Sequence, residues 1–334
     1  MNPMLYLVTG GAGFIGSHIT ERLLADGHQV RILDNFSTGK YENIPASDNV
    51  EVIEGDVGDT DTVRQCMHDI DVVFHEAAIA SVPETVGNPL ASERTNYRGT
   101  VNVLEAARQA GTRRVVFACS AAVYGDLPEL PKQETLPVKP LSPYAIDKLA
   151  SEHACKVYHA LYGLETVALR YFNVFGPRQD PSSPYSGVIS IFSDCTRQGR
   201  QPFINGDGGQ TRDFVYVSDV VEANMRAAAA ETAPGNAYNI ATGSTVTINE
   251  LLQTICRLEG KTFDPAYKPV REGDIRHSCA DISAARLDLG WLPQVAFEDG
   301  LKKLLESIQA IQTTAGFEIL ATNQTDKHAK ADKT

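Results

Sequence analysis

The segment TGGAGFIG at positions 9–16 constrains the fold most, because it places a glycine-rich turn between an apolar run and a helical pattern. Gly10, Gly13 and Gly16 allow a tight turn and close approach to a pyrophosphate, whose charge meets the N-terminus of a helix beginning near Phe14. Asp34 ends the next apolar run, QVRILD, about 20 residues on, where a carboxylate holds ribose hydroxyls and repels a 2′-phosphate. Glycines serving only a tight turn would leave Asp34 unexplained. The pattern predicts a dinucleotide site that takes NAD rather than NADP.

Short apolar runs alternate with helical patterns along the first half of the chain. The runs MLYLVTG, QVRILD, VEVIEGD, DVVFHEAA, RVVFACS and TVALRYF read as buried strands, and the pattern predicts about seven strands in all. The expected fold class is α/β, a doubly wound parallel sheet (Rossmann) with a smaller C-terminal α/β domain that binds the substrate. We expect the sheet domain over 1–175, with later segments able to return to it, the smaller domain over 176–312, and a flexible tail over 313–334.

Composition limits the partners and the compartment. The formal net charge of −12, without basic blocks, argues against a nucleic-acid or anionic membrane partner. The six cysteines contain no C-x-x-C pair, which indicates neither a zinc site nor a disulfide framework, so no metal is expected and reduced thiols in the cytoplasm fit best. The N-terminal apolar run is too short for a signal or a membrane span and reads as a first strand.

Further candidates for the dinucleotide site follow the strands. Asp56 and Val57 come at the end of the third strand, and Ala77 and Ala78 follow the fourth, at carboxyl ends where open α/β sheets bind ligands. His75 is interpreted as structural, since it has no His or Cys partner at metal-ligand spacing. The remaining loop residues assigned to the cofactor are Phe14, Ile15, Asn35 and Ser37.

A serine, a tyrosine and a lysine suggest redox chemistry at the same sheet edge. Ser120 ends the strand RVVFACS, and Tyr144 and Lys148 are four residues apart, on one face of the following helix. A neighbouring ammonium and an oxidised nicotinamide would both stabilise the phenolate, so Tyr144 could act as a base near neutral pH. Tyrosine and lysine at this spacing are also common on solvated helices. Together with the glycine loop and Ser120, the pair favours nicotinamide-assisted oxidation of an alcohol.

TGGAGFIG, Ser120, YAIDK and RYFNVFGPRQ resemble the extended short-chain dehydrogenase/reductase family of nucleotide-sugar enzymes, in particular its 4-epimerase branch, from about Met4 to about Ile311. The resemblance implies that Tyr144 is the base, Lys148 its tuner and Ser120 a support for proton transfer. It also implies that Asn96 orders the site near the lysine and that Phe172 neighbours the nicotinamide. A homodimer through two long helices, near 88–110 and 142–162, is expected from the same likeness.

The resemblance also bears on the reaction. Dehydratases of the family carry an Asp-Glu pair after the serine and decarboxylases a Glu in this stretch, whereas this chain has Ala121 and Ala122. Epimerisation of a UDP-hexose at C4 through a transient 4-keto sugar is therefore expected, with NAD regenerated and retained. Arginines bind phosphates well, which makes them candidates for holding the diphosphate. Arg178 in GPRQ is instead interpreted as structural. The substrate residues implied by the family, some of them shared with catalysis, are Ser81, Ser120, Tyr144, Asn173, Val188, Arg212, Arg271, Asp274 and Ser278.

Ser278 lies at a position that the family fills with tyrosine in enzymes restricted to UDP-glucose and UDP-galactose. The smaller serine predicts that UDP-GlcNAc and UDP-GalNAc are accepted as well. The alternatives are a UDP-glucuronate or UDP-pentose 4-epimerase and another nucleotide-sugar-modifying enzyme of the same family. A redox-sensing regulator built on this fold would keep the glycine loop but lose the tyrosine or the lysine, and this chain has both.

Overall fold

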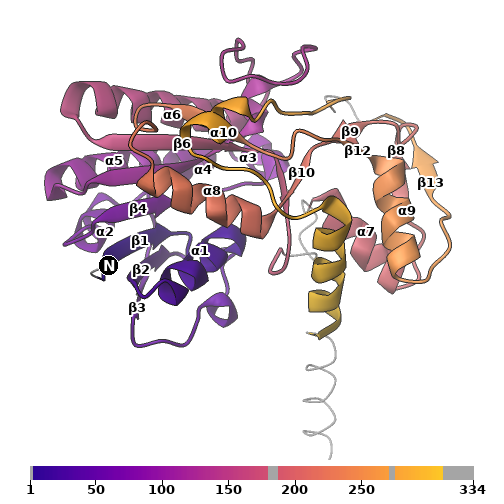
Figure 1. Ribbon diagram of the computed structural model, residues 1–334, viewed down its shortest axis with the longest axis horizontal. Helices are drawn as coiled ribbons and strands as arrows, with labels where there is room; N and C mark the ends of the chain where they lie inside the picture. The colour runs from indigo at the N-terminus through magenta and orange to yellow at the C-terminus, as the bar shows by residue number, and fades with distance from the viewer. Residues whose placement is uncertain (1–2, 180–186, 271–274, 311–334) are drawn as a thin grey trace, which may run out of the picture.

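The protein is described by a computed structural model that covers residues 3–179, 187–270 and 275–310. Its centre is a seven-stranded parallel sheet of order β11-β6-β5-β4-β1-β2-β3 (Figure 1). The strands are β1 (Leu5–Thr9), β2 (Gln29–Asp34), β3 (Val50–Glu54), β4 (Val72–His75), β5 (Arg114–Ser120), β6 (Glu165–Tyr171) and β11 (Ala237–Ile240). The chain runs outward from β1 in both directions, so the order of connection reverses between β1 and β4.

Helices cover both faces of this sheet, as its apolar strands require. One face packs against α1 (Phe14–Ala25) and α8 (Val217–Ala229). The other packs against α2 (Thr60–Cys66), α5 (Gly99–Ala110) and α6 (Pro143–Tyr162). Three shorter helices, α3 (Val82–Gly87), α4 (Pro89–Ser92) and α10 (Ser283–Asp288), and three irregular turns, η1 (Tyr41–Asn43), η2 (Glu93–Arg98) and η3 (Ala121–Tyr124), complete the larger lobe. The predicted doubly wound α/β fold is confirmed.

A smaller lobe lies to the right of the sheet in Figure 1. Its core joins α7 (Val188–Arg197) and α9 (Ile248–Leu258) with helical residues 297–310. Two strand pairs lie beside these helices: β8 (Phe203–Asn205) with β13 (Ala266–Lys268), and β9 (Thr211–Arg212) with β12 (Val246–Thr247). A third pair joins β7 (Asn173–Phe175), which follows directly after β6 in the chain, to β10 (Phe214–Tyr216).

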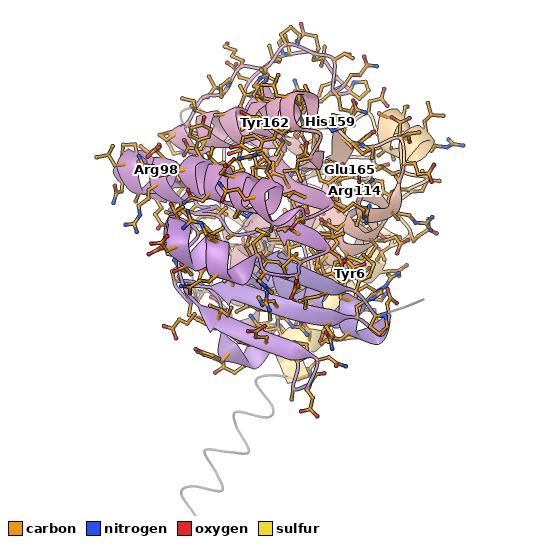
Figure 2. All side chains as sticks on the ribbon, turned by 90° about the vertical axis from the view of Figure 1, so that its left-hand side faces the viewer. Tyr6, Arg98, Arg114, His159, Tyr162 and Glu165 are labelled. Carbon is orange, nitrogen blue, oxygen red and sulfur yellow. The ribbon has the colours of Figure 1, made fainter. Side chains whose placement is uncertain are left out.

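The six strands read from the sequence are all present, and the seventh, β11, comes from beyond residue 175. The return of the chain to the sheet is held in part by Arg114, a buried residue at the start of β5 (Figure 2). Its Nη1 donates to the carbonyl oxygens of Ala227 and Ala230, both at 2.8 Å, and its Nε donates to Glu165. A guanidinium at the C-terminus of α8 also meets the negative end of the helix dipole.

In the described part of the chain, no helix is both long enough and apolar enough to cross a membrane. In the same ranges, no three His, Cys, Asp or Glu side chains are grouped so that they could hold a metal ion. The predicted tail over 313–334 lies outside the described residues, as do Arg271 and Asp274.

Candidate functional site

The main cavity, of about 470 Å³, lies at the carboxyl ends of the strands, where the order of connection reverses between β1 and β4. Open α/β sheets bind their ligands at this point. Twelve of the residues assigned to the cofactor line this one cavity: Gly10, Gly13, Phe14, Ile15, Gly16, Asp34, Asn35, Ser37, Asp56, Val57, Ala77 and Ala78. The structure thus brings together residues that the sequence spreads over some seventy positions.

The glycine loop fits a pyrophosphate. Gly10 has a φ of 69°, and a Cβ there would lie 2.8 Å from the nitrogen of Ala77. A Cβ on Gly16 would overlap the carbonyl oxygen of Gly10, so the helix could not pack against the turn. Helix α1 begins after Gly13 without a side-chain cap and without an acid in its first turn. Its first N–H groups therefore stay available to an anion.

Asp34 is fixed at the other side of the loop. Its Oδ2 accepts from the nitrogen of Ala12 and its Oδ1 from the nitrogen of Phe36, both at 2.9 Å. Nearby, Asn35 Nδ2 donates to Asp56 Oδ2 at 3.1 Å, which joins the ends of β2 and β3. A carboxylate oxygen can accept more than one hydrogen bond, so Asp34 can still receive a ribose hydroxyl. The donor set and the loop together fit NAD.

Ser120, Tyr144 and Lys148 meet beside this cavity without lining it. Ser142 caps α6 by accepting from the nitrogen of Ala145, so Tyr144 falls in the first turn of the helix. Lys148 is buried, and its Nζ donates to the carbonyl oxygen of Ala118 at 2.7 Å. The same Nζ lies 5.9 Å from the centre of the Tyr144 ring. The two side chains thus project from the same face of α6, as their four-residue spacing predicts.

The pKa values of this group are set mainly by burial. Burial raises the pKa of Tyr144 to about 12, the hydrogen bond with Ser120 lowers it, and the charge of Glu76 raises it. Burial lowers the pKa of Lys148, and nearby acids raise it. In the polypeptide itself, then, the phenol is not yet a base near neutral pH. The sequence analysis attributes the further lowering of this pKa to a neighbouring ammonium and to the positive charge of an oxidised nicotinamide.

Asn96 lies in η2, a π-helical segment within the stretch near 88–110 for which the sequence predicts one long helix. Its Oδ1 accepts from the nitrogen of Ile79 at 2.8 Å, and its Nδ2 donates to the carbonyl oxygen of Ile79 at 3.1 Å. Ile79 lines the cavity, so Asn96 holds the loop after β4 in place. Phe172 is buried directly after β6, with its ring centre 6.3 Å from that of Tyr124.

The candidate substrate residues within the described ranges lie on several elements. Ser81 caps α3, Val188 is the first residue of α7, and Asn173 donates to the carbonyl oxygen of Asp213 at 3.0 Å. Arg212 is the second residue of β9, and the nitrogen of Ser278 donates to the carbonyl oxygen of Thr211, the first residue of β9, at 3.2 Å. Ser278 and Arg212 are thus held next to one another.

Asp213 was missed by the sequence analysis. Its buried carboxylate accepts from the nitrogens of Thr242, Gly243 and Ala280, and so it fixes the segment just after Ser278. Arg178, read as structural, donates to Ser17 Oγ at 3.1 Å and pairs with Glu21, which ties the turn after β7 to α1.

The fold and the cavity together define an enzyme that depends on a dinucleotide. A family model, "NAD dependent epimerase/dehydratase family", matches residues 6–241, and the chain belongs to this family. The prediction of NAD as the cofactor is confirmed at this level.

Three relatives illustrate the likeness. The UDP-glucose 4-epimerase of Mycolicibacterium smegmatis is 43% identical over 308 residues, covering 91% of this chain and 98% of that protein. The solved UDP-glucose 4-epimerase of Thermotoga maritima with UDP-glucose is 38% identical, with a TM-score of 0.89 over 92% of this chain and all of that one. The UDP-N-acetylglucosamine 4-epimerase of Methanobrevibacter ruminantium, in complex with UDP-N-acetylmuramic acid, is 40% identical, with a TM-score of 0.89 over 93% and 99%. Nucleotide-sugar decarboxylases and a dTDP-glucose 4,6-dehydratase also match.

Proposed function

We propose that this protein is a 4-epimerase of UDP-hexoses that retains its NAD. The observation that carries the proposal is the grouping of Ser120, Tyr144 and Lys148 beside the cofactor cavity, with Ala121 and Ala122 following the serine. Elimination and decarboxylation in this family need acids where the two alanines stand. Relatives with UDP-glucose 4-epimerase activity in their names support the same reading.

The residues would act as follows. Tyr144, as phenolate, takes the proton of the sugar 4-hydroxyl, and Ser120 holds that oxygen by a hydrogen bond. Lys148 keeps a positive charge close to the phenolate, which stabilises it. NAD, when bound, would supply a hydride acceptor, so that the hydride taken from C4 can be given back to the opposite face of the keto sugar. After the keto sugar turns over, Tyr144 gives its proton back to the 4-oxygen. Arg212, together with Arg271 outside the described ranges, would hold the diphosphate during this rotation.

The test of this function is a comparison of Tyr144→Phe with the unmodified protein on UDP-galactose. Loss of the phenol should lower turnover by about 10² to 10⁴, the usual contribution of a general base, while bound NAD remains. Tyr267→Phe is the matched control, because Tyr267 is 54% exposed and lies in β13 of the smaller lobe. Equal turnover of Tyr144→Phe and Tyr267→Phe would refute the assignment.

We further propose that both plain and N-acetylated UDP-hexoses are accepted, because Ser278 leaves space beside the C2 substituent. Ser278 follows His277, whose Nδ1 lies 3.0 Å from Thr211 Oγ1, and its own nitrogen donates to the carbonyl oxygen of Thr211, so the backbone at this position is held beside β9. Ser278→Tyr should abolish turnover of UDP-GalNAc and spare that of UDP-galactose, and Ser278→Ala should keep both. Undiminished UDP-GalNAc turnover by Ser278→Tyr would show that Ser278 is not the gate.

We also propose that the chain forms a homodimer in the cytoplasm. The outer surface of α6 carries Ile146, Val157, Leu161 and Tyr162, which are 48% to 70% exposed. Figure 2 shows this helical face, with Arg98 just before α5 and Tyr162 at the end of α6. An exposed apolar stripe of this kind on α6 suits the same helix of a second copy of the chain.

A further inference from the structure

Glu76 lies on the wall of the cavity, and its carboxylate has no role in the proposed chemistry. It follows His75, the last residue of β4, and lines the cavity together with Ala77. Its Oε1 accepts a hydrogen bond of 2.9 Å from the hydroxyl of Tyr171, the last residue of β6. That hydroxyl accepts in turn from Asn224 Nδ2 of α8 at 2.7 Å, and Asn224 also donates to the carbonyl oxygen of Val220. The carboxylate is therefore held in a fixed position by two layers of the fold.

The titratable groups around Glu76 come from three elements. Tyr171 comes from β6, Tyr144 and Lys148 come from α6, and His75 precedes it in its own strand. Burial lowers the pKa of His75 to about 3, so His75 is neutral and adds no charge. Burial raises the pKa of Glu76 to about 7, while Tyr171 and Lys148 lower it. Glu76 is then largely ionised only above neutral pH.

The position of Glu76 places it at the reactive end of the cavity. Asp34 and the loop at Gly13 mark the ribose and pyrophosphate end, on the far side of β1. The charge of Glu76 acts on Tyr144 and Lys148, which are the base and its stabilising charge in the proposed function. The nicotinamide half of the cofactor must lie at that same end, because hydride passes between it and the sugar.

A nicotinamide ring carries a positive charge when oxidised and none when reduced. A fixed carboxylate in a site of low dielectric stabilises the oxidised ring and leaves the reduced ring without an ion-pair partner. Resting on the proposed function, we propose that Glu76 is the counter-charge of the oxidised nicotinamide and keeps the bound cofactor oxidised between turnovers. An enzyme that returns its hydride in every cycle gains from this bias, since a reduced cofactor left behind by an escaped keto sugar would stop it.

The test is the reduction potential of the bound cofactor, followed by absorbance at 340 nm during titration against a redox couple of known potential. The comparison is between the unmodified holoenzyme and Glu76→Gln at pH 8.5 and pH 6. Glu76→Gln should favour the reduced form by about tenfold at pH 8.5, which is about 30 mV for two electrons. At pH 6, where Glu76 takes up a proton, the difference should shrink. Glu84→Gln is the matched control, because Glu84 lines the exposed part of the same cavity, and its shift should be smaller.

Equal potentials for Glu76→Gln and the unmodified protein at pH 8.5, with both folded, would overturn the inference. Tyr171→Phe gives a second route if Glu76→Gln does not fold. It removes the hydrogen bond that lowers the pKa of Glu76, so the pH dependence of the potential should move to higher pH, and an unmoved dependence would also count against the inference. The readout does not depend on which sugar is turned over. Failure to convert UDP-hexoses would thus count against the proposed function and leave this inference standing.

Discussion

At the scale of single residues, the site depends on two opposing effects on the pKa of Tyr144, burial and hydrogen bonding. Burial pushes the pKa of the phenol up, and Ser120 is the protein group that brings it down. The lysine, four residues on, is anchored to the carbonyl oxygen of Ala118. Ser120 therefore serves two ends in the proposed chemistry: it holds the sugar oxygen and it tunes the base.

Ser120→Ala should raise the pKa of Tyr144 further, because it removes the hydrogen bond that lowers this pKa. The phenolate is the active form, so the rising limb of the pH profile of kcat should move to higher pH. Ser120→Thr keeps a hydroxyl and should keep the limb near its original pH. A profile of Ser120→Ala that coincides with that of the unmodified protein would show that Ser120 does not tune the base.

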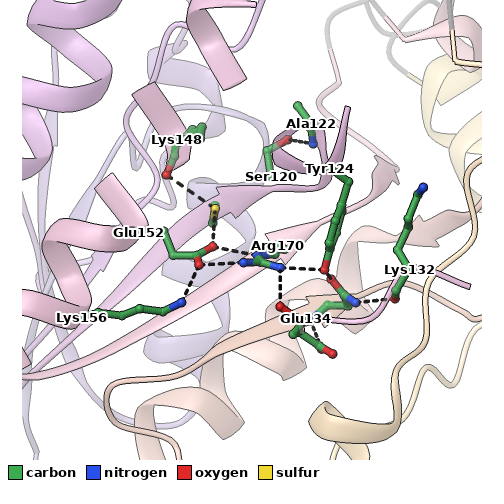
Figure 3. A network of polar contacts seen from close by, with 11 residues as sticks. Ser120, Ala122, Tyr124, Lys132, Glu134, Lys148, Glu152, Lys156 and Arg170 are labelled. Carbon is green, nitrogen blue, oxygen red and sulfur yellow. Dashed lines mark hydrogen bonds and ion pairs between the residues drawn. The ribbon is translucent and has the colours of Figure 1, made fainter. Parts of the chain in front are cut away.

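At the scale of elements, the strand β6 and the helix α6 are joined by a buried ion pair (Figure 3). Arg170 Nε and Nη2 donate to the two oxygens of Glu152 at 2.7 and 2.8 Å, and both side chains are almost fully buried. Arg170 Nη1 also donates to the hydroxyl of Tyr124 at 2.8 Å. Glu152 is one turn after Lys148, so the pair fixes the helix that carries Tyr144 and Lys148, the base and its stabilising charge in the proposed function.

Arg170→Met should lower the free energy of unfolding by about 3 to 5 kcal/mol, since it leaves a buried carboxylate without its partner. Arg64→Met, which breaks an exposed pair with Asp61, should cost no more than about 1 kcal/mol. Denaturant unfolding followed by circular dichroism would measure both changes. Similar values for the two variants would contradict the account of α6.

The same pair should respond to acid. Burial by itself would raise the pKa of Glu152, but the hydrogen bonds and charge of Arg170 and Lys156 outweigh it and lower this pKa to about 2. A carboxyl group whose pKa is lower in the folded than in the unfolded state stabilises the protein fully at pH values above its unfolded pKa. This stabilisation is lost as the pH falls through the folded pKa. The difference in stability between the unmodified protein and Arg170→Met should therefore narrow between about pH 4.5 and pH 2.

The elements also show what a sequence can and cannot predict. Six strands and the helices at 14–25 and 143–162 could be read from apolar runs, a proline after Ser142 and glycine turns, because these signals are local. The strand β11 pairs with β6 across a separation of some seventy positions, so no local signal gives its place in the sheet. The π-helical turn at Glu93–Arg98 looks like ordinary helix in the sequence, yet it carries Asn96. Glu76 and Asp213 gain their meaning only from partners far along the chain.

At the scale of the whole molecule, the two lobes and the outer helices divide the work. The larger lobe provides the cofactor cavity and the substrate candidates Ser81, Ser120 and Tyr144. The other described candidates, Asn173, Val188, Arg212 and Ser278, follow β6 in the chain. The exposed apolar stripe on α6 lies on the opposite side of the helix from Lys148, which is buried. Association through that stripe would leave the cavity open to solvent and to substrate.

Leu161→Glu should convert a dimer into single chains, because it places a charge in the apolar contact. Light scattering during size-exclusion chromatography should give twice the 36.2 kDa of one chain for the unmodified protein and a single-chain mass for the variant. Leu287→Glu, at a residue 83% exposed on α10, should keep the larger mass. A single-chain mass for the unmodified protein would rule out the homodimer.

The central claim is that the chain is a 4-epimerase of UDP-hexoses that carries its own NAD. The measurement that tests it most directly is incubation of the purified protein, with no NAD added, with UDP-galactose and separately with UDP-GalNAc, followed by separation of the products by ion exchange. The account predicts that UDP-glucose forms from the first substrate and UDP-GlcNAc from the second. Absence of any conversion, even after NAD is supplied, would contradict it.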